Sequence, residues 1–243
     1  MRALYFKEIR SFLNSIIGFI FIFIFLVATG IFHWIVPGGT NLLEGAEADL
    51  IPFFNLAPIM FFILIPALTM RSIAEERRTG TIELLFTRPI SDLKIILAKY
   101  FAGITLLILA IIPTVVYYIS MYYLSLEPEK FDHGATITSY IGLILLGSVF
   151  VAIGIFSSSL TSSQIVAFII SMFLCWLFFD GLNRLGAFNV MGSFDNVLQY
   201  FGMVKHYDAI RKGVIDTSDI VYFLSLILFF ILSALTVIKT LKK

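Results

Sequence analysis

Long apolar runs separated by short polar segments make up most of the chain. A helix needs about 20 apolar residues to cross the hydrocarbon core of a bilayer. Six runs meet this length, at residues 12–36, 50–70, 100–124, 138–160, 164–182 and 220–238. In lipid each backbone N–H and C=O must find a partner within the chain, which favours helices, and the strand alternation of outer-membrane barrels is absent. The pattern predicts an all-α, polytopic membrane protein with six transmembrane helices in one domain, residues 1–243.

Composition excludes the common soluble classes. The chain is 59% hydrophobic and only 14% charged, whereas soluble proteins are about a quarter charged. The net charge of +1 and the lack of a clustered basic surface argue against a nucleic-acid partner. The first apolar run is too long for the core of a cleavable signal peptide, so we interpret it as a retained span.

Basic residues indicate how the chain is oriented, because short cytoplasmic loops are enriched in Lys and Arg. The N-terminal segment, the segment of residues 71–99 and the C-terminus together hold 12 of the 17 basic residues. Residues 37–49, which connect the first two predicted spans, hold none. We therefore expect both termini and residues 71–99 to be cytoplasmic.

The chain lacks the motifs of a self-powered or catalytic protein. No Gly is followed by Lys, so a phosphate-binding loop is absent. His33, His133 and His206 are too scattered to predict a metal site, and we expect no catalytic residues and no cofactor on this chain. Asp180 is the only Asp, Glu, Lys or Arg within the predicted spans, and we interpret it as the start of a turn, residues 180–183. The chain must draw energy from a partner, or need none.

Residues 71–91 form the most informative polar segment. Four consecutive charges, residues 75–78, predict a helix that continues out of the membrane, and Gly80 should end it. Thr81 can cap a second short helix in which Ile82, Leu85 and Phe86 share one face. Such a helix suits a groove on another protein, but it could also lie on the lipid surface.

Residues 72–91, with the core Glu-Glu-Arg-Arg-Thr-Gly-Thr-Ile-Glu-Leu-Leu and the ending Arg-Pro-Ile-Ser, resemble the loop between the second and third spans of ABC-2 type permeases. In that family the loop forms a coupling helix that meets an ATPase on a separate chain. The resemblance implies that ATP and Mg²⁺ bind the partner. It assigns ATPase coupling to Glu75, Glu76, Arg77, Arg78, Thr79, Gly80, Thr81, Ile82, Glu83, Leu84 and Leu85.

Two further segments extend the resemblance. Residues 2–15 are similar to the family's interfacial helix, with Tyr5, Lys7, Glu8, Ile9 and Arg10 at its centre. One predicted apolar face of this helix consists of Tyr5, Ile9, Phe12, Leu13 and Ile16. Residues 211–223 resemble the approach to the last span in a subset that includes the gliding-motility permeases and the copper-processing permeases of nitrous oxide reductase operons. The resemblance implies a bacterial inner-membrane protein with a second permease copy or a related permease, and an auxiliary membrane subunit with a periplasmic part.

The segment of residues 183–219 is too apolar to stand in water. Val197, Leu198, Phe201 and Val204 recur at helical spacing, and Asp195 or Asn196 can cap this helix. We expect short or re-entrant helices before the last span, acting either as an outer gate or as a plug over the span ends. In the fourth span Gly147, Gly154 and Ser158 share a face, which favours close packing within the molecule over a substrate path.

These features predict the membrane subunit of an ABC transporter, which couples ATP hydrolysis on a partner to export or mechanical work. The resemblance implies that this work belongs to a gliding-motility or secretion system. One alternative is a stand-alone secondary transporter or channel, because three spans with a long inner segment followed by three with a long outer segment can form an inverted repeat. The other is a non-transporting membrane scaffold of a motility complex.

Overall fold

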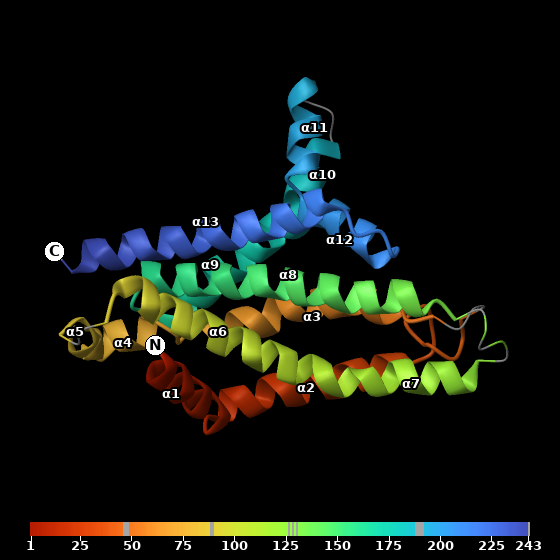
Figure 1. Ribbon diagram of the computed structural model, residues 1–243, viewed down its shortest axis with the longest axis horizontal. Helices are drawn as coiled ribbons and strands as arrows, with labels where there is room; N and C mark the ends of the chain where they lie inside the picture. Colours follow the sequence, from red (N-terminus) through yellow and green to blue (C-terminus); the bar gives the residue numbers. More distant parts are fainter. Residues whose placement is uncertain are drawn as a thin grey trace.

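The computed structural model is a helical bundle, elongated along one axis (Figure 1). It describes residues 1–45, 49–87, 90–125, 127, 129, 131–187 and 192–242, without the side chains of residues 17, 84–86, 193 and 194. Every regular element within these residues is a helix, which confirms the predicted all-α class.

Five helical stretches are long and apolar enough to cross a membrane. They are α3 and α4 (Ile51–Arg78), α6, η1 and α7 (Asp92–Leu124), α8 (His133–Leu160), α9, η3 and α10 (Gln164–Ala187), and α13 (Thr217–Leu241). The helices α1 (Arg2–Leu13) and α2 (Ile16–Trp34) add a sixth if this bent pair forms one span. Each predicted span overlaps one of these stretches, so the structure supports five spans, or six with α1–α2.

Composite stretches divide at defined residues. The first consists of α3 (Ile51–Thr69) and the short α4 (Ala74–Arg78). The second consists of α6 (Asp92–Ile111), the 3₁₀ turn η1 (Ile112–Thr114) and α7 (Val115–Leu124). The fourth consists of α9 (Gln164–Trp176), the π-helical turn η3 (Leu177–Gly181) and α10 (Leu182–Ala187). The expectation of a turn at Asp180 is wrong, because Asp180 lies in η3 and pairs with Arg184 one helical turn later.

The helix α8 forms the centre of the bundle and contacts α3, α6, α9, α12 and α13. Its small residues allow this close approach. A Cβ added at Gly147 would lie 2.5 Å from Leu107 Cδ2 of α6, and one added at Gly154 would lie 2.7 Å from Thr69 Cβ of α3. The prediction that these glycines serve packing within the molecule is confirmed.

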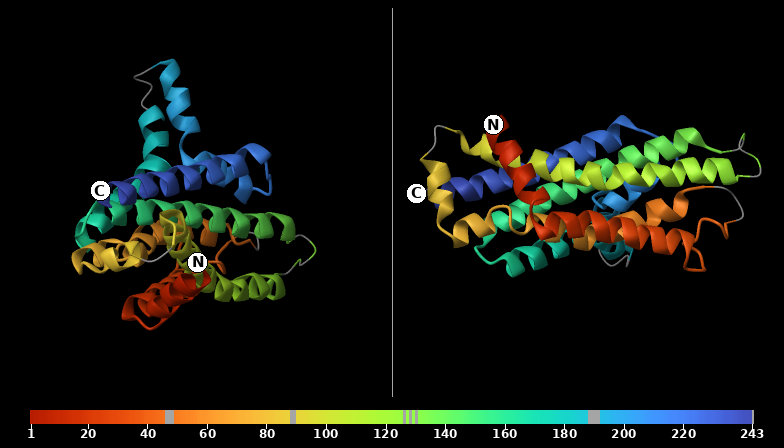
Figure 2. Two further views of the ribbon diagram at one scale, coloured as in Figure 1. Left: turned by 60° about the vertical axis from the view of Figure 1, so that its left-hand side comes forward. Right: turned by 90° about the horizontal axis from the view of Figure 1, so that it is seen from below.

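Both termini lie at one end of the bundle, together with α4 and α5 (Thr81–Phe86) (Figures 1 and 2). We call this the inner end and the opposite one the outer end. The three segments richest in basic residues therefore gather at the same end. The side of the membrane that this end faces stays a prediction.

About halfway along the bundle, α10 and α11 (Ser193–Tyr200) form a hairpin that stands out from its side, and α12 (Met203–Arg211) returns to α8 (Figures 1 and 2). The amide of Gln199 closes this hairpin by donating to the Gly186 carbonyl at 2.9 Å. Three short helices thus precede the last span in this part of the chain, and their outer or re-entrant position in a membrane stays a prediction.

The prediction of one helix through Val197, Leu198, Phe201 and Val204 is wrong. The chain leaves α11 after Tyr200 and starts α12 at Met203. Side chains from later elements bind the last carbonyls of α11: Tyr222 donates to the Phe201 carbonyl at 2.5 Å, and His206 Nε2 lies 2.9 Å from the Tyr200 carbonyl.

The predicted caps of α11 are also wrong. Asp195 and Asn196 lie inside the helix, and Gly192 precedes it with φ of 63°. Only glycine adopts this conformation without strain, so the turn is set by Gly192 and needs no capping carboxylate.

Candidate functional site

The helices α4 and α5 form a compact pair that projects from the inner end of α3. Gly80 separates them with φ of 72°, which confirms that it ends the first helix. The prediction that Thr81 caps the second helix is wrong, because Thr81 is the first residue within α5. Its Oγ1 instead lies 2.9 Å from Thr79 Oγ1, and Thr79 donates to the Glu75 carbonyl at 2.8 Å. The two hydroxyls thus close the end of α4.

The α4–α5 segment (residues 74–86) has an anchored base and an exposed tip. Ser72, Ile73 and Ala74 at the base are buried. At the tip, residues 78–83, every residue except Ile82 is exposed: Arg78, Thr79, Gly80, Thr81 and Glu83.

Ile82 is half-buried against the core. A groove of about 370 Å³ lies between this segment and the end of α13, lined by Arg77, Ile82, Glu83, Leu241 and Lys242. The side chains of Leu84, Leu85 and Phe86 lie outside the described residues, so the apolar face predicted for Ile82, Leu85 and Phe86 stays a prediction.

Ser158 of α8 fixes the junction between α3 and α4. Its Oγ accepts hydrogen bonds from the backbone N–H groups of Ile73 and Ala74, each at 2.9 Å, and donates to the Met70 carbonyl at 2.9 Å. One donor and two acceptor positions are all that a hydroxyl offers. The side chain therefore satisfies three backbone groups where the helix changes course, and it ties α4 to α8.

Charged side chains hold α4 in place on two sides. On one side, Arg77 Nη1 donates to the Ser159 carbonyl of α8 at 2.6 Å. From the turn that precedes the segment, Arg71 Nε lies 3.3 Å from Glu75 Oε2. Arg77 is thus an anchoring residue of the predicted coupling set, whereas Arg78 points to the surface.

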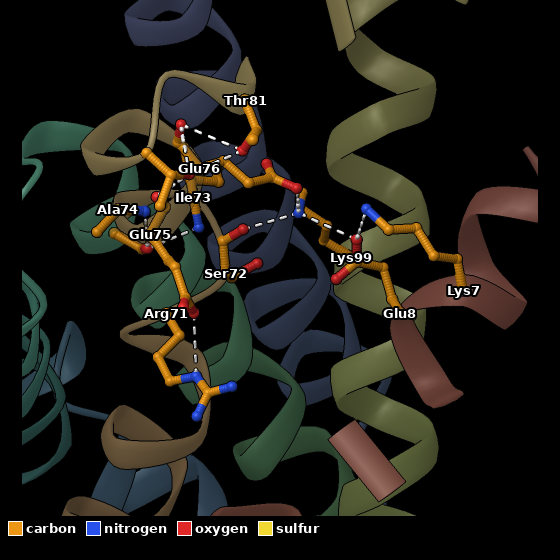
Figure 3. A network of polar contacts seen from close by, with 12 residues as sticks. Lys7, Glu8, Arg71, Ser72, Ile73, Ala74, Glu75, Glu76, Thr81 and Lys99 are labelled. Carbon is orange, nitrogen blue, oxygen red and sulfur yellow. Dashed lines mark hydrogen bonds and ion pairs between the residues drawn. The ribbon is translucent and has the colours of Figure 1, made fainter. Parts of the chain in front are cut away.

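The other side of α4 is held by Lys99 of α6, whose side chain is 1% exposed (Figure 3). Lys99 Nζ donates to Glu76 Oε1 at 2.9 Å, to the Ser72 carbonyl at 2.7 Å and to Glu8 Oε1 of α1 at 3.2 Å. An ammonium has three N–H donors, and each of them finds an acceptor here. We call this set the Lys99 network: Lys99, Glu8, Glu76 and the Ser72 carbonyl.

The helix α1 lies against α6. It buries Leu4, Glu8 and Phe12, and Tyr5 Oη lies 2.7 Å from Thr105 Oγ1. The face predicted from Tyr5, Ile9, Phe12, Leu13 and Ile16 is wrong at its end. Ile16 is 77% exposed, because α1 ends at Leu13 and the chain bends before α2.

The remaining residues predicted at the centre of α1 divide between the core and the surface. Lys7 and Arg10 are exposed and Ile9 is half-buried, whereas Glu8 belongs to the buried stripe.

Lys99, Ser158 and the Ser72 carbonyl were not among the predicted site residues. The helical period contained one usable signal for Lys99. Lys99 lies four residues after Ile95 and four residues before Gly103, so the three share one face of the helix. Ile95 and Gly103 lie on the buried face of α6. A lysine at that register requires acceptors, which sequence spacing alone could not locate.

The outer gate candidates lie on both sides of the break between α11 and α12. Val197 and Phe201 are 44% and 52% exposed, and Leu198 and Val204 are half-buried. A gating role for these residues stays a prediction. Burial raises the pKa of the neighbouring Tyr207 phenol, which donates to the Phe54 carbonyl at 2.8 Å and holds α12 on α3.

The buried charges of this site are paired with each other. Within the part of the chain that the structure describes, no group of three or more metal-ligating side chains comes together. One comparison with known proteins is informative: the model of the family described as ABC-2 family transporter protein matches residues 3–241. No curated protein matches the chain.

Proposed function

The chain belongs to the ABC-2 family of transporter proteins, and from this premise we propose that a separate ATPase drives it through the α4–α5 segment. The observation that carries the proposal is the exposed tip, residues 78–83, on a base anchored by buried polar contacts to α1, α6 and α8. A partner that pushes on this tip displaces several helices together.

In the proposed cycle the partner supplies all the chemistry. ATP and Mg²⁺ bind two ATPase subunits, each docked on one membrane subunit of a pair formed by two copies of this chain or by this chain and a related permease. Closure of the ATPase pair moves α4, and Ser158 and Arg77 transmit this displacement to α8. The clustering of basic segments at the inner end supports a cytoplasmic position for both termini in a bacterial inner membrane.

The work performed is proposed to be export or mechanical work in a motility or secretion system. Support comes from residues 211–223, which resemble the same stretch in gliding-motility permeases. In such an assembly an auxiliary membrane subunit with a periplasmic part would lie near the outer end. The exposed Val197 and Phe201, in and just after the α10–α11 hairpin, are the proposed gate residues.

The docking proposal is tested by reversing one charge at the tip. Glu83 is exposed on α5 within the tip, and Lys94 is exposed in the first turn of α6, outside the tip residues 78–83. We expect Glu83→Arg to weaken co-purification with the cognate ATPase and to abolish the change in ATPase rate that the membrane subunit causes. Lys94→Glu, an opposite charge reversal of equal size, should leave both unchanged.

A backbone variant gives a second, independent test of the tip. Gly80→Pro is incompatible with φ of 72°, because proline fixes φ near −65°. It should therefore misplace α5 and weaken ATPase binding as Glu83→Arg does. Unchanged binding in both variants would refute docking at this tip.

Two further outcomes separate the alternatives. Gradient-driven uptake by the purified chain alone would establish a secondary transporter or channel. An unchanged cellular phenotype after inactivation of the partner's ATP hydrolysis would establish a scaffold.

A further inference from the structure

We propose that Glu8 is a positioning residue that makes α1 move together with the α4–α5 segment, through the Lys99 network. The inference rests on the proposed function, since it names the path that the displacement takes. In this account α1 is part of the transmission machinery and has a role beyond lying on the membrane surface.

The geometry of Lys99 carries the inference. Its three contacts reach three separate parts of the chain: Glu8 on α1, Ser72 in the turn after α3, and Glu76 on α4. All three donors are used, so the ammonium cannot follow one partner without stretching its bonds to the others. An ammonium held by three partners keeps its position relative to all of them and so transmits a displacement. The two side chains of a single exposed ion pair would instead rearrange.

The surroundings strengthen these contacts. Lys99 is 2% exposed and Glu8 7% exposed, so neither charge is well screened by water. Coulomb attraction grows as the local dielectric falls, and a buried charge that loses its partner carries a large penalty. The Glu8–Lys99 contact should therefore persist while α4 moves.

Other contacts of α1, on the N-terminal side of Glu8, also hold it against α6. Leu4 packs with Ile95 and Ala98 of α6, and Tyr5 shares a hydrogen bond with Thr105. The chain then bends between α1 and α2. At that bend Gly18 packs so closely on the Phe12 carbonyl that an added Cβ would clash with it. Displacement of α1 therefore reaches α2 directly.

This path is separate from the one through Ser158. Ser158 and Ser159 connect α4 with α8, and the Lys99 network connects α4 with α1 and α6. Cutting one connection should leave the other intact, which makes the proposal testable.

Glu8→Leu is the variant that cuts the α1 connection most selectively. Lys99 keeps Glu76 and the Ser72 carbonyl, and α1 keeps Leu4, Phe12 and Tyr5. Leucine suits a buried helical position. The matched control is Arg10→Leu, which removes an exposed charge from the same helix. Lys99→Met is less suitable, because it removes the ammonium from both the buried Glu8 and the half-buried Glu76 and so destabilises the fold itself.

The first measurement uses the membrane subunit alone. Spin labels at Ser11→Cys on α1 and Thr87→Cys after α5, both exposed, report their distance in a Cys175→Ser background. We expect a narrow distance distribution in the parent and in Arg10→Leu, and a broadened one in Glu8→Leu. Glu8→Asp, which keeps the charge on a shorter side chain, should lie between them. An unchanged distribution in Glu8→Leu would overturn the proposal.

The second measurement adds the cognate ATPase in a hydrolysis-deficient form. A label at Ser162→Cys, exposed between α8 and α9, replaces the one at position 87. Binding of ATP should shift the distance from residue 11 to residue 162 in the parent and in Arg10→Leu, and this shift should be lost in Glu8→Leu although the ATPase still binds.

A shift that persists in Glu8→Leu would overturn the α1 path. If the ATPase fails to bind the parent, the proposed function fails, and the first measurement still decides whether Glu8 holds α1 to the segment.

Discussion

At the scale of single residues, Lys99 illustrates how a charge becomes tolerable inside a packed interface. Burying an ammonium is costly unless each donor is satisfied and an opposite charge is close. Glu76 and Glu8 provide the charge and the Ser72 carbonyl completes the hydrogen bonds. Such a group specifies geometry more than it adds stability, because its attraction mainly offsets its own desolvation.

The stability of the Lys99 network is testable by removing its members in different combinations. Lys99→Met leaves Glu76 without the Lys99 ammonium and Glu8 with only the exposed Lys7, 3.9 Å away, and should lower the free energy of unfolding by about 3–5 kcal/mol. The triple variant Glu8→Leu, Glu76→Leu, Lys99→Met should recover most of this loss, since it removes the buried charges together. Reversible unfolding in mixed micelles measures both. A triple variant no more stable than Lys99→Met would contradict this electrostatic account.

Lys99 also shows what sequence spacing provides and what it leaves open. The helical period places Lys99 on the buried face of α6 beside Ile95 and Gly103. Its partner Glu8 is 91 residues away, and no local pattern connects the two. The predicted coupling set contained Glu76 and Arg77 but could not distinguish these anchoring residues from the exposed Arg78 and Glu83.

At the scale of elements, helix packing around α8 depends on glycine. An added Cβ at Gly154 would meet Thr69 of α3, whereas one at Gly30 of α2 would have its nearest neighbour, Tyr117 Oη, at 3.5 Å, an ordinary contact. We expect Gly154→Ala to lower the free energy of unfolding by about 1–3 kcal/mol through overpacking. Gly30→Ala should be neutral or slightly stabilising, because alanine favours helices. Equal stability of the two variants in the same unfolding assay would contradict the packing argument.

Elements were predictable wherever hydrophobic length alone defines them. All six apolar runs lie mainly in helices, because lipid favours the same structure that the pattern predicts. The predicted break between the fourth and fifth runs lies at residues 161–163, between α8 and α9. The break between α11 and α12 was not predictable. It depends on His206 and Tyr222 binding carbonyls of Tyr200 and Phe201, contacts that exist only in the folded chain.

At the scale of the whole molecule, α8 connects the two ends. Near the inner end Ser158 holds the junction of α3 and α4. Towards the outer end Ser139 Oγ donates to the Arg211 carbonyl at 3.0 Å, and Gly142 lies against Ile210 of α12. Displacement of α4 thus has a continuous packed route to α12, which carries the α10–α11 hairpin at its start. In the proposed function, a partner ATPase is assigned as the energy source for this displacement.

The most direct test of this assignment is site-directed cross-linking in native membranes. A single cysteine at Thr81, in the exposed tip, is compared with one at Lys212, exposed at the outer end, each in a Cys175→Ser background. We predict that the cysteine at position 81 cross-links to the cognate ATPase and resists membrane-impermeant thiol reagents in intact cells, whereas the cysteine at position 212 shows the opposite behaviour. Labelling of position 81 from outside intact cells, or absence of its cross-link to the ATPase, would contradict the account.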